Sequence, residues 1–268
     1  MSDFLQQMAT RSAERARAAG GIRERDLDKP VVPLRLDAFD VIAEIKGRSP
    51  AEGALAGAEL DRAAQARQYA RGGAAAISVL TEPSRFDGAL EHLEAVAAAV
   101  PGTPVMRKDF LVEPVQVLEA RKAGASGVLL IAAMLSDAGL RAMLDAAFEL
   151  GMFVLLEAFD ETDLARSAAL LEAPADRDRA AAGQLLIGVN TRNLRTLEVD
   201  STRLERLAPL LPAARCVAES GLKTAADAAA VAERGYRMAL VGSALMRSTD
   251  PAGLVAAMRA AGSAKVAA

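Results

Sequence analysis

Residues 41–46 read VIAEIK, an apolar run that ends in a glutamate and a lysine. Further apolar runs along the chain also end in polar or charged side chains: AISVLTE (76–82), PVMRKDF (104–110), VLLEAF (154–159), LIGVNTR (186–192), VAESG (217–221) and ALVGS (239–243). A parallel strand that is buried on both faces has a continuous apolar sequence, so a charge repeated at its C-terminal end requires a reason. In a closed barrel of alternating strands and helices, those ends converge on a single cavity.

The spacing of these runs predicts one such barrel. Strand candidates begin near positions 41, 75, 104, 127, 152, 185, 214 and 238, and intervals of roughly 23 to 34 residues hold a strand, a helix and two short loops. Helical periodicity and good helix formers fill residues 60–71, 90–100, 114–123, 137–150, 162–171, 202–211, 225–234 and 253–260. Alternation of strand and helix implies a parallel sheet, and the same alternation occurs in an open, doubly wound fold. The charged strand ends favour a single (β/α)8 TIM barrel of the α/β class.

The chain is expected to form one domain over residues 1–268, with an N-terminal extension at 1–40 and the barrel at 41–262. Its 268 residues match the roughly 250 of a single barrel. In the extension, Phe4, Leu5 and Met8 recur at helical spacing and basic residues follow them. Residues 3–19 are therefore predicted to form an amphipathic helix that covers part of the barrel near its catalytic rim.

Composition excludes several classes of function. The net charge is -3, from 32 basic and 35 acidic residues, so no overall positive field attracts nucleic acid. The apolar runs are far shorter than the roughly 18 to 20 residues of a membrane span, and charges occupy the N-terminus where a secretory segment would be apolar. No membrane association and a cytoplasmic location are expected.

The chain has one cysteine, Cys216, and one histidine, His92. These counts argue against a disulfide framework, metal sites built from these residues and a Ser-His-Asp triad. His92 is expected to be an exposed helix residue and Cys216 a small core residue.

The strand ends themselves predict acid–base chemistry. Because residues two apart share a face of a strand, Ile42, Glu44 and Lys46 point into the barrel, as do Met106, Lys108 and Phe110, and Phe153, Leu155 and Glu157. A buried layer of charges is costly unless the charges pair, and paired buried groups have shifted, coupled pKa values. We expect a proton-transfer site without histidine, with lysine as acid and glutamate as base. The alternative is an ion-pair layer that only fills the barrel. The charged residues concerned are Glu44, Lys46, Lys108, Glu157 and Glu219.

Two other patterns indicate the substrate. Gly221 follows the seventh strand, and Gly242 and Ser243 follow the eighth, ahead of a short helical stretch. TIM barrels often bind phosphate at these two loops, where glycine lets backbone N–H groups approach the anion. Apolar residues also lie at or beyond strand ends and predict a pocket for a ring, although core packing explains Leu129 and Ile131 equally well. This apolar set is Phe86, Phe110, Leu129, Ile131 and Leu194.

These segments resemble the indole-3-glycerol phosphate synthase family of tryptophan biosynthesis. The resemblance rests on IAEIKGRSPAEG, ISVLTEPSRFDGALEHL, PVMRKDFLVEPVQVLEARKAGASGVLLI, LIGVNTRNLRTLEVD, AESGL and LVGSALMR, in unbroken order from about residue 41 to residue 251. It implies a carbon–carbon lyase of the carboxy-lyase type. The reaction would close the ring of 1-(2-carboxyphenylamino)-1-deoxyribulose 5-phosphate to indole-3-glycerol phosphate, with loss of carbon dioxide and water and with no cofactor. Association with other enzymes of the tryptophan pathway is left open.

The resemblance also implies roles for individual residues. Lys108 matches the general acid of the family, and Glu157 matches the general base. Glu44, Lys46 and Glu219 match residues that position the substrate and assist dehydration. Asn190 and Ser220 would hold hydroxyls and the anthranilate portion, and Arg192 would support that loop. The phosphate would be held by Ser49, Gly221, Gly242 and Ser243, and the anthranilate ring by Phe86, Phe110, Leu129, Ile131 and Leu194.

Three departures from the family pattern leave alternatives open. They are Gly47-Arg48-Ser49-Pro50-Ala51 after the first strand, Ala158-Phe159 after Glu157, and the charged segment EAPADRDRAAAGQ at 172–184. A paralogue acting on a related phosphosugar amine would retain the catalytic residues. A phosphosugar isomerase of the related barrels is a second alternative, against which RKDF and NTRNL argue. A silent phosphometabolite-binding subunit is a third, but it would be expected to lack Lys108 or Glu157.

Overall fold

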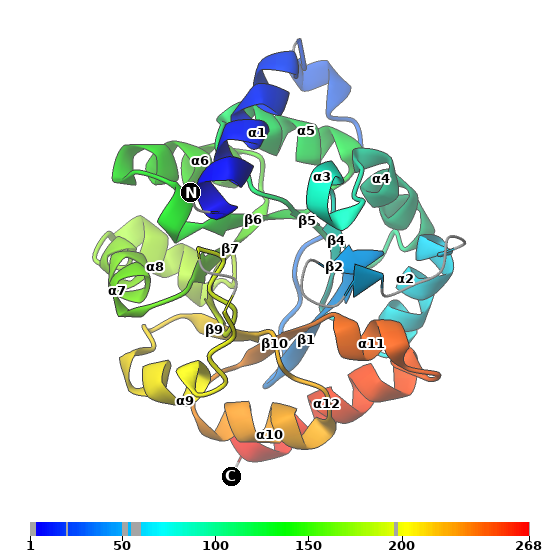
Figure 1. The fold of residues 1–268 in the computed structure, drawn as a ribbon, viewed down its shortest axis with the longest axis vertical. Coiled ribbons are helices and arrows are strands. Elements are labelled where there is room, and N and C mark those ends of the chain that lie inside the picture. The colour runs from blue at the N-terminus through cyan, green and yellow to red at the C-terminus, as the bar shows by residue number, and fades with distance from the viewer. Residues whose placement is uncertain (1–3, 20, 50–52, 55–59, 196–197, 268) are drawn as a thin grey trace.

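The barrel predicted from the sequence dominates the computed structural model, which describes residues 4–19, 21–49, 53–54, 60–195 and 198–267. In that part of the chain, eight parallel strands close in the order β1-β10-β9-β8-β7-β6-β5-β4, with helices around them (Figure 1). The predicted starts are confirmed to within one residue. The strands are β1 (Asp40–Ile45), β4 (Ala76–Leu80), β5 (Val105–Lys108), β6 (Gly127–Ile131), β7 (Phe153–Ala158), β8 (Leu185–Asn190), β9 (Arg215–Glu219) and β10 (Met238–Val241).

The alternation of side chains along each strand divides the core into two clusters. Val41, Ala43 and Ile45 of β1 belong to the cluster between strands and helices, whereas Ile42 belongs to the cluster inside the barrel. The interior cluster also contains Met106, Leu129, Phe153, Leu155, Leu186, Val217, Met238 and Leu240. This arrangement confirms the predicted facing of the strands. In several strands the last inward-facing residue is charged, and its side chain is therefore directed at the axis of the barrel.

The helices that cover the barrel begin where the sequence supplies caps. Asp61, Ser136 and Thr224 each accept a hydrogen bond from a backbone N–H of the first turn that follows. Gly124 ends α5 with φ of 100°, a conformation that favours glycine. The helices of the barrel layer are α2 (Arg62–Arg71), α4 (Leu90–Ala99), α5 (Pro114–Ala123), α6 (Asp137–Glu149), α7 (Glu161–Leu170), α8 (Pro174–Ala181), α9 (Arg203–Leu207), α10 (Ala225–Glu233) and α12 (Pro251–Val266).

Some elements differ from the sequence-based expectation. The predicted helix 202–211 is the short α9 followed by a 3-10 turn, η3 (Ala208–Leu210), which contains Pro209. The last helix continues to Val266, beyond the expected barrel boundary at 262. A short antiparallel pair, β2 (Arg48–Ser49) and β3 (Gly53–Ala54), follows β1. Short helices α3 (Pro83–Phe86) and α11 (Ser243–Arg247) follow β4 and β10, and 3-10 turns η1 (Glu24–Asp26) and η2 (Ala132–Met134) complete the elements.

The charged segment 172–184 contains the helix α8, which packs against α6. Asp176 is buried and pairs with Arg141 of α6 at 2.6 Å and with Arg179 at 2.8 Å. The Arg179 guanidinium lies 4.4 Å from the centre of the Phe148 ring, a favourable cation–π distance. The charges of this segment therefore attach α8 to the outside of the barrel, away from the strand ends.

The N-terminal helix α1 (Phe4–Ala18) forms as predicted and lies over one side of the barrel, beside α5 and α6 (Figure 1). Its buried residues are Leu5, Met8, Ser12 and Ala16, spaced three or four apart as one helix face requires. Leu5 and Met8 join the cluster inside the barrel. The extension therefore covers one side of the rim, as expected.

Within the described residues, the helices lack a segment that is both long enough and apolar enough to cross a bilayer.

Deletion of residues 1–30 should leave a folded barrel that melts at a lower temperature. The deletion removes the buried contacts of Leu5 and Met8 but none of the paired strands. Each kcal/mol of lost docking energy should lower the melting temperature by about 2 to 4 °C for a chain of this size. Circular dichroism of the full-length and shortened proteins measures both the helix content and the melting temperature. An unchanged melting temperature would show that α1 does not stabilise the barrel.

Candidate active site

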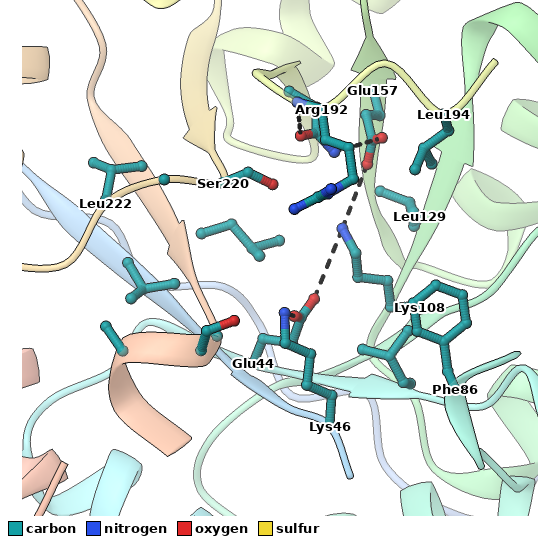
Figure 2. Close-up of a pocket in the computed structure, with 18 of the residues that line it drawn as sticks. Glu44, Lys46, Phe86, Lys108, Leu129, Glu157, Arg192, Leu194, Ser220 and Leu222 are labelled. Atoms are coloured by element: carbon teal, nitrogen blue, oxygen red, sulfur yellow. Dashed lines mark hydrogen bonds and ion pairs between the residues drawn. The ribbon is translucent and has the colours of Figure 1, made fainter. Parts of the chain in front are cut away.

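The C-terminal ends of the strands enclose a cavity of about 580 Å³. Residues from all eight barrel strands or the loops that follow them reach it, as expected for the catalytic rim of a barrel. Of the predicted site residues, those that line the cavity are Glu44, Lys46, Phe86, Lys108, Phe110, Leu129, Ile131, Glu157, Asn190, Arg192, Leu194, Ser220, Gly221, Gly242 and Ser243. Figure 2 shows Lys108 between Glu44 and Glu157, with Arg192 reaching into the cavity from the other side.

Lys108, at the end of β5, is surrounded by carboxylates from three other strands. Its Nζ lies 3.1 Å from Glu219 of β9, 3.4 Å from Glu157 of β7 and 3.9 Å from Glu44 of β1. The Glu44 carboxylate also pairs with Lys46 Nζ at 3.0 Å. The carboxylates are almost completely buried, and the Lys108 side chain is 15% exposed. The predicted charged layer therefore forms, and its members pair.

Burial and pairing act in opposite directions on these groups. Burial disfavours the charged form of Lys108, but Glu219, Glu157 and Glu44 outweigh burial and hold its pKa above the usual value. Burial likewise opposes ionisation of Glu44, yet Lys46 and Lys108 hold its pKa below the usual value. For Glu219, burial and the neighbouring Glu157 raise the pKa to about 8. Lys108 is therefore charged near neutral pH, and Glu219 holds a proton there.

Two glycines make room for this cluster. A side chain at Gly188 of β8 would collide with the Glu219 carboxylate and with Leu155. A Cβ at Gly242 would lie 2.5 Å from Glu44 Oε1 and 3.0 Å from Lys46 Nζ, which is closer than packed atoms approach. Gly242 therefore serves the charged cluster as well as the loop after β10.

Asn190, at the end of β8, connects the cluster to the next loop. Its amide Nδ2 donates to Glu157 Oε1 at 2.9 Å, and its Oδ1 accepts from the backbone N–H of Arg192 at 2.9 Å. Arg203 of α9 donates to the backbone carbonyls of Asn190 and Thr191 at 2.8 and 3.0 Å. These bonds fix one carboxylate oxygen of Glu157 and the start of the loop that presents Arg192 and Leu194.

The loops after β9 and β10 carry the residues expected to hold phosphate. Ser220 and Gly221 both have left-handed backbones, with φ of 67° and 82°, and such a conformation costs energy at the serine. Gly242 precedes α11, and Ser243 is its first residue. Lys223 and Arg247 also line the cavity, so two cationic side chains lie on this side of it. Ser49 is placed within β2, but its side chain lies outside the described residues, and its expected contact with phosphate stays a prediction.

The apolar side of the cavity is an aromatic wall of three phenylalanines. The rings of Phe86 and Phe110 lie 6.1 Å apart. Phe4 of α1 meets Phe110 edge to face at 5.9 Å and lines the cavity too, a favoured geometry for aromatic pairs. Leu129 and Ile131 end β6 on the same wall and are also part of the interior cluster. Both residues therefore pack in the core and line the cavity, and their expected contact with a ring stays a prediction.

Several cavity residues were not identified from the sequence. Phe4 was placed on the covering helix, but its approach to Phe110 depends on how α1 docks, which a sequence does not show. Leu80, Leu240 and Val241 lie within their strands, and Asp109 directly follows β5. Ala244 and Arg247 belong to α11, and Leu222 and Lys223 lie in the loop after β9. The residues missed are Phe4, Leu80, Asp109, Leu222, Lys223, Leu240, Val241, Ala244 and Arg247. Glu219 was predicted correctly as a member of the cluster, although it lies behind Lys108 and does not line the cavity.

Two residues outside the site were also assigned from the sequence. Cys216 is buried in the core as expected, and burial raises the pKa of its thiol to about 12. His92 of α4 is half-buried, so its expected full exposure was wrong. The neighbouring helix supplies Arg62, whose charge, together with burial, lowers the pKa of His92. In the described part of the chain, no three acidic, histidine or cysteine side chains gather in a way that could hold a metal ion.

Replacement of Glu219 by glutamine should change the pH dependence of stability in a defined direction. A pKa raised from about 4.5 to about 8 means that the folded state holds more protons than the unfolded state between these values. The stabilising contribution is complete below about pH 4.5 and is lost as the pH rises through about 8. The melting temperature of Glu219→Gln, minus that of the wild type, should therefore increase from pH 5.5 to pH 8.5. Exposed Glu149→Gln is the control, with parallel curves expected. A constant difference for Glu219→Gln would mean that Glu219 is ionised throughout.

Solved structures with the same fold include enzymes of other names. The crystal structure of 3-hexulose-6-phosphate synthase from Salmonella typhimurium superposes with a TM-score of 0.62 at 18% sequence identity, covering 85% of this chain and all of that one. The structure of KGPDC from Streptococcus mutans gives a TM-score of 0.60 at 13% identity, covering 86% of this chain and 99% of that one. At such low identity, these similarities establish the barrel fold alone.

Sequence relationships are more specific. The indole-3-glycerol phosphate synthase of Nocardioides sp. is 48% identical over 237 residues, which are 87% of this chain and 86% of that protein. The synthase of Parafrankia sp. is 44% identical over 259 residues, covering 95% of this chain and 91% of that protein. The family model for indole-3-glycerol phosphate synthase matches residues 23–258. With the charged cluster, the aromatic wall and the two glycine loops arranged around one cavity, the chain belongs to the indole-3-glycerol phosphate synthase family.

Proposed function

We propose that the protein is an indole-3-glycerol phosphate synthase that converts 1-(2-carboxyphenylamino)-1-deoxyribulose 5-phosphate to indole-3-glycerol phosphate. The observation that carries the proposal is the Lys108 ammonium, held among Glu219, Glu157 and Glu44 at one end of a cavity with an aromatic wall. The reaction needs a proton donor beside a ketone, a base, and an apolar surface for the anthranilate ring. Family membership indicates the substrate, and the cavity contains a group for each of these three roles.

The first step forms the new carbon–carbon bond. The ring carbon that bears the carboxylate attacks the ketone, and the carbonyl electron pair moves to oxygen. Lys108 donates a proton to this oxygen as it becomes an alkoxide. Because the surrounding carboxylates raise the pKa of Lys108, the ammonium keeps its proton near neutral pH and transfers it to a base as strong as an alkoxide.

Carbon dioxide and water are then lost from the product of this step. Cleavage of the bond between the ring and the carboxylate releases carbon dioxide and returns an electron pair to the ring. The new hydroxyl then leaves as water after it accepts a proton, while the adjacent carbon of the former sugar loses one. The overall change breaks a carbon–carbon bond without hydrolysis or oxidation, so we assign the enzyme to the carboxy-lyases.

Two glutamates are suited to the proton transfers of dehydration. Glu157 is oriented by Asn190 at 2.9 Å and lines the cavity, which supports its assignment as the base. Glu219, with its pKa raised to about 8, holds a proton near neutral pH and can return one to Lys108 at 3.1 Å.

The two ends of the substrate fit opposite sides of the cavity. The aromatic wall of Phe86, Phe110 and Phe4 would hold the anthranilate ring and exclude water from it. The phosphate would lie at Gly221, Gly242 and Ser243, which line the cavity in the loop after β9 and at the start of α11. In this orientation the ketone lies between the two ends, where Lys108 lies.

The assay is turnover of the carboxyphenylamino-deoxyribulose phosphate, followed by the fluorescence of the indole product. The wild type should be active, and Lys108→Ala should lower kcat by roughly 100- to 10,000-fold, as loss of a general acid does. Lys122→Ala, an exposed lysine of α5, is the control and should retain wild-type kcat. A folded wild type without turnover would refute the proposed substrate. Lys108→Ala with kcat near wild type would remove the lysine from the mechanism.

A second variant tests the phosphate position. Ser243→Asp places a carboxylate at the start of α11, so it should raise KM much more than it lowers kcat because it repels the substrate phosphate. Ser243 is preferable to Gly242 for this test, since a side chain at Gly242 would displace Glu44 and Lys46 and lower kcat as well. Inorganic phosphate should inhibit the wild type competitively. Unchanged KM in Ser243→Asp, or noncompetitive inhibition, would place the phosphate elsewhere.

A further inference from the structure

Asp109 lies between two residues of the cavity and has a buried, highly connected carboxylate. Its side chain is fully buried, and it directly follows Lys108 and precedes Phe110. Oδ1 accepts the backbone N–H of Phe110 at 2.8 Å, while Oδ2 accepts Thr81 Oγ1 at 2.9 Å and Arg107 Nη2 at 3.1 Å. The backbone N–H of Thr81 in turn donates to the carbonyl of Lys108 at 3.1 Å. The orientation of Asp109 therefore fixes the turn that presents Lys108 and Phe110.

The remaining bond to this carboxylate comes from the N-terminal helix. Arg15 Nη2 donates to Asp109 Oδ1 at 2.7 Å, and Arg15 Nη1 lies 3.8 Å from Glu82, which caps α3. The Arg15 side chain is 28% exposed and both carboxylates are fully buried. A charged hydrogen bond to a buried carboxylate is stronger than an exposed pair. Arg15 thus joins α1 to the ends of both β4 and β5.

A second buried polar contact sets the position of α1 along the barrel. The Gln116 amide of α5 donates to Ser12 Oγ at 2.9 Å and to the Ser12 carbonyl at 3.3 Å, and both side chains are fully buried. The backbone carbonyl of Gln116 accepts Arg107 Nη1 at 2.9 Å. Since Ser12 precedes Arg15 by three residues on one helix face, this contact directs Arg15 at Asp109.

We propose that Arg15 is a positioning residue, which acts through Asp109 to hold Lys108 and Phe110 in their working geometry. The inference rests on the proposed function, because it assigns Lys108 the acid role. Without Arg15, Asp109 Oδ1 retains only the Phe110 N–H among the contacts described above. The negative charge of the buried carboxylate is then paired with one cation fewer. The turn 108–110 then has freedom to shift. A displacement of about 1 Å at a reacting group can cost on the order of 100-fold in rate.

The test compares Arg15→Gln with Arg17→Gln, since Arg17 is exposed on the same helix. Arg15→Gln should lower kcat by about tenfold or more, and Arg15→Lys should recover part of this loss because it restores a cation near Asp109. Arg17→Gln should match the wild type in kcat, KM and melting temperature. An Arg15→Gln protein that melts at a lower temperature but keeps wild-type kcat would show that Arg15 only attaches α1, and would overturn the proposal.

A double variant tests whether the effect passes through Asp109. If it does, Arg15→Gln should lower kcat little or not at all in an Asp109→Asn background, because the two changes interrupt one connection. If the two substitutions lower kcat by factors that multiply in the double variant, Arg15 acts by another route, and the assignment is overturned. If Asp109→Asn does not fold, the decision rests on the single variants and on the exchange measurement that follows.

Amide hydrogen exchange gives a readout that needs no turnover. In Arg15→Gln, the peptide covering residues 104–112 should lose protection, above all at the Phe110 N–H, while Arg17→Gln should retain it. If the wild type shows no turnover of the substrate, the proposed function fails, and this exchange comparison alone decides whether Arg15 positions the turn. Unchanged protection of 104–112 in Arg15→Gln would overturn the proposal in either case.

Discussion

The ammonium of Lys108 among three buried carboxylates is the interaction on which the rest of the site depends. Glu44, Glu157 and Glu219 come from three different strands and surround this one cation, and the proton that Glu219 holds near neutral pH removes its repulsion with Glu157. The lysine, in turn, would lose its proton in an apolar barrel without them. The barrel supplies the necessary geometry because its strand ends converge. Each charge is therefore tolerable only in the presence of the others, and the closed sheet brings them together.

This mutual dependence also explains the glycines of the interior. Gly188 and Gly242 lie beside Glu219 and Glu44, and any side chain at either position would meet a carboxylate. In the sequence, Gly242 fits a phosphate loop, whereas Gly188 is one small residue within an apolar run. The structure adds that both positions are kept small to admit charged groups. A layer filled with Val and Leu would need no such spaces, which favours a catalytic interpretation of the charges over simple filling of the barrel.

Much of the fold could be predicted because the relevant signals are local. The strands have continuous apolar runs, and their starts were placed within one residue; Asp61, Ser136 and Thr224 mark helix starts through ordinary capping. The inward facing of Glu44, Lys108 and Glu157 follows from the period of a strand. The conversion of 172–184 into α8 was not foreseen, because its stability depends on the pairing of Asp176 with Arg141, which are distant in sequence. Contacts of α1 with the cavity were missed for the same reason.

The barrel fold does not by itself determine function. The 3-hexulose-6-phosphate synthase structure shares the fold at 18% identity, so the strands and helices tolerate almost complete replacement of their residues. In this chain the charged cluster lies at the strand ends, and the segment that carries Lys108 also contacts residues of the N-terminal extension. Arg15 and Ser12 belong to an extension outside the barrel, yet they contact Asp109 and Gln116, which flank the segment bearing Lys108 and Phe110. The barrel thus fixes where Lys108 lies, and helix α1 supplies further bonds to the turn that presents this lysine.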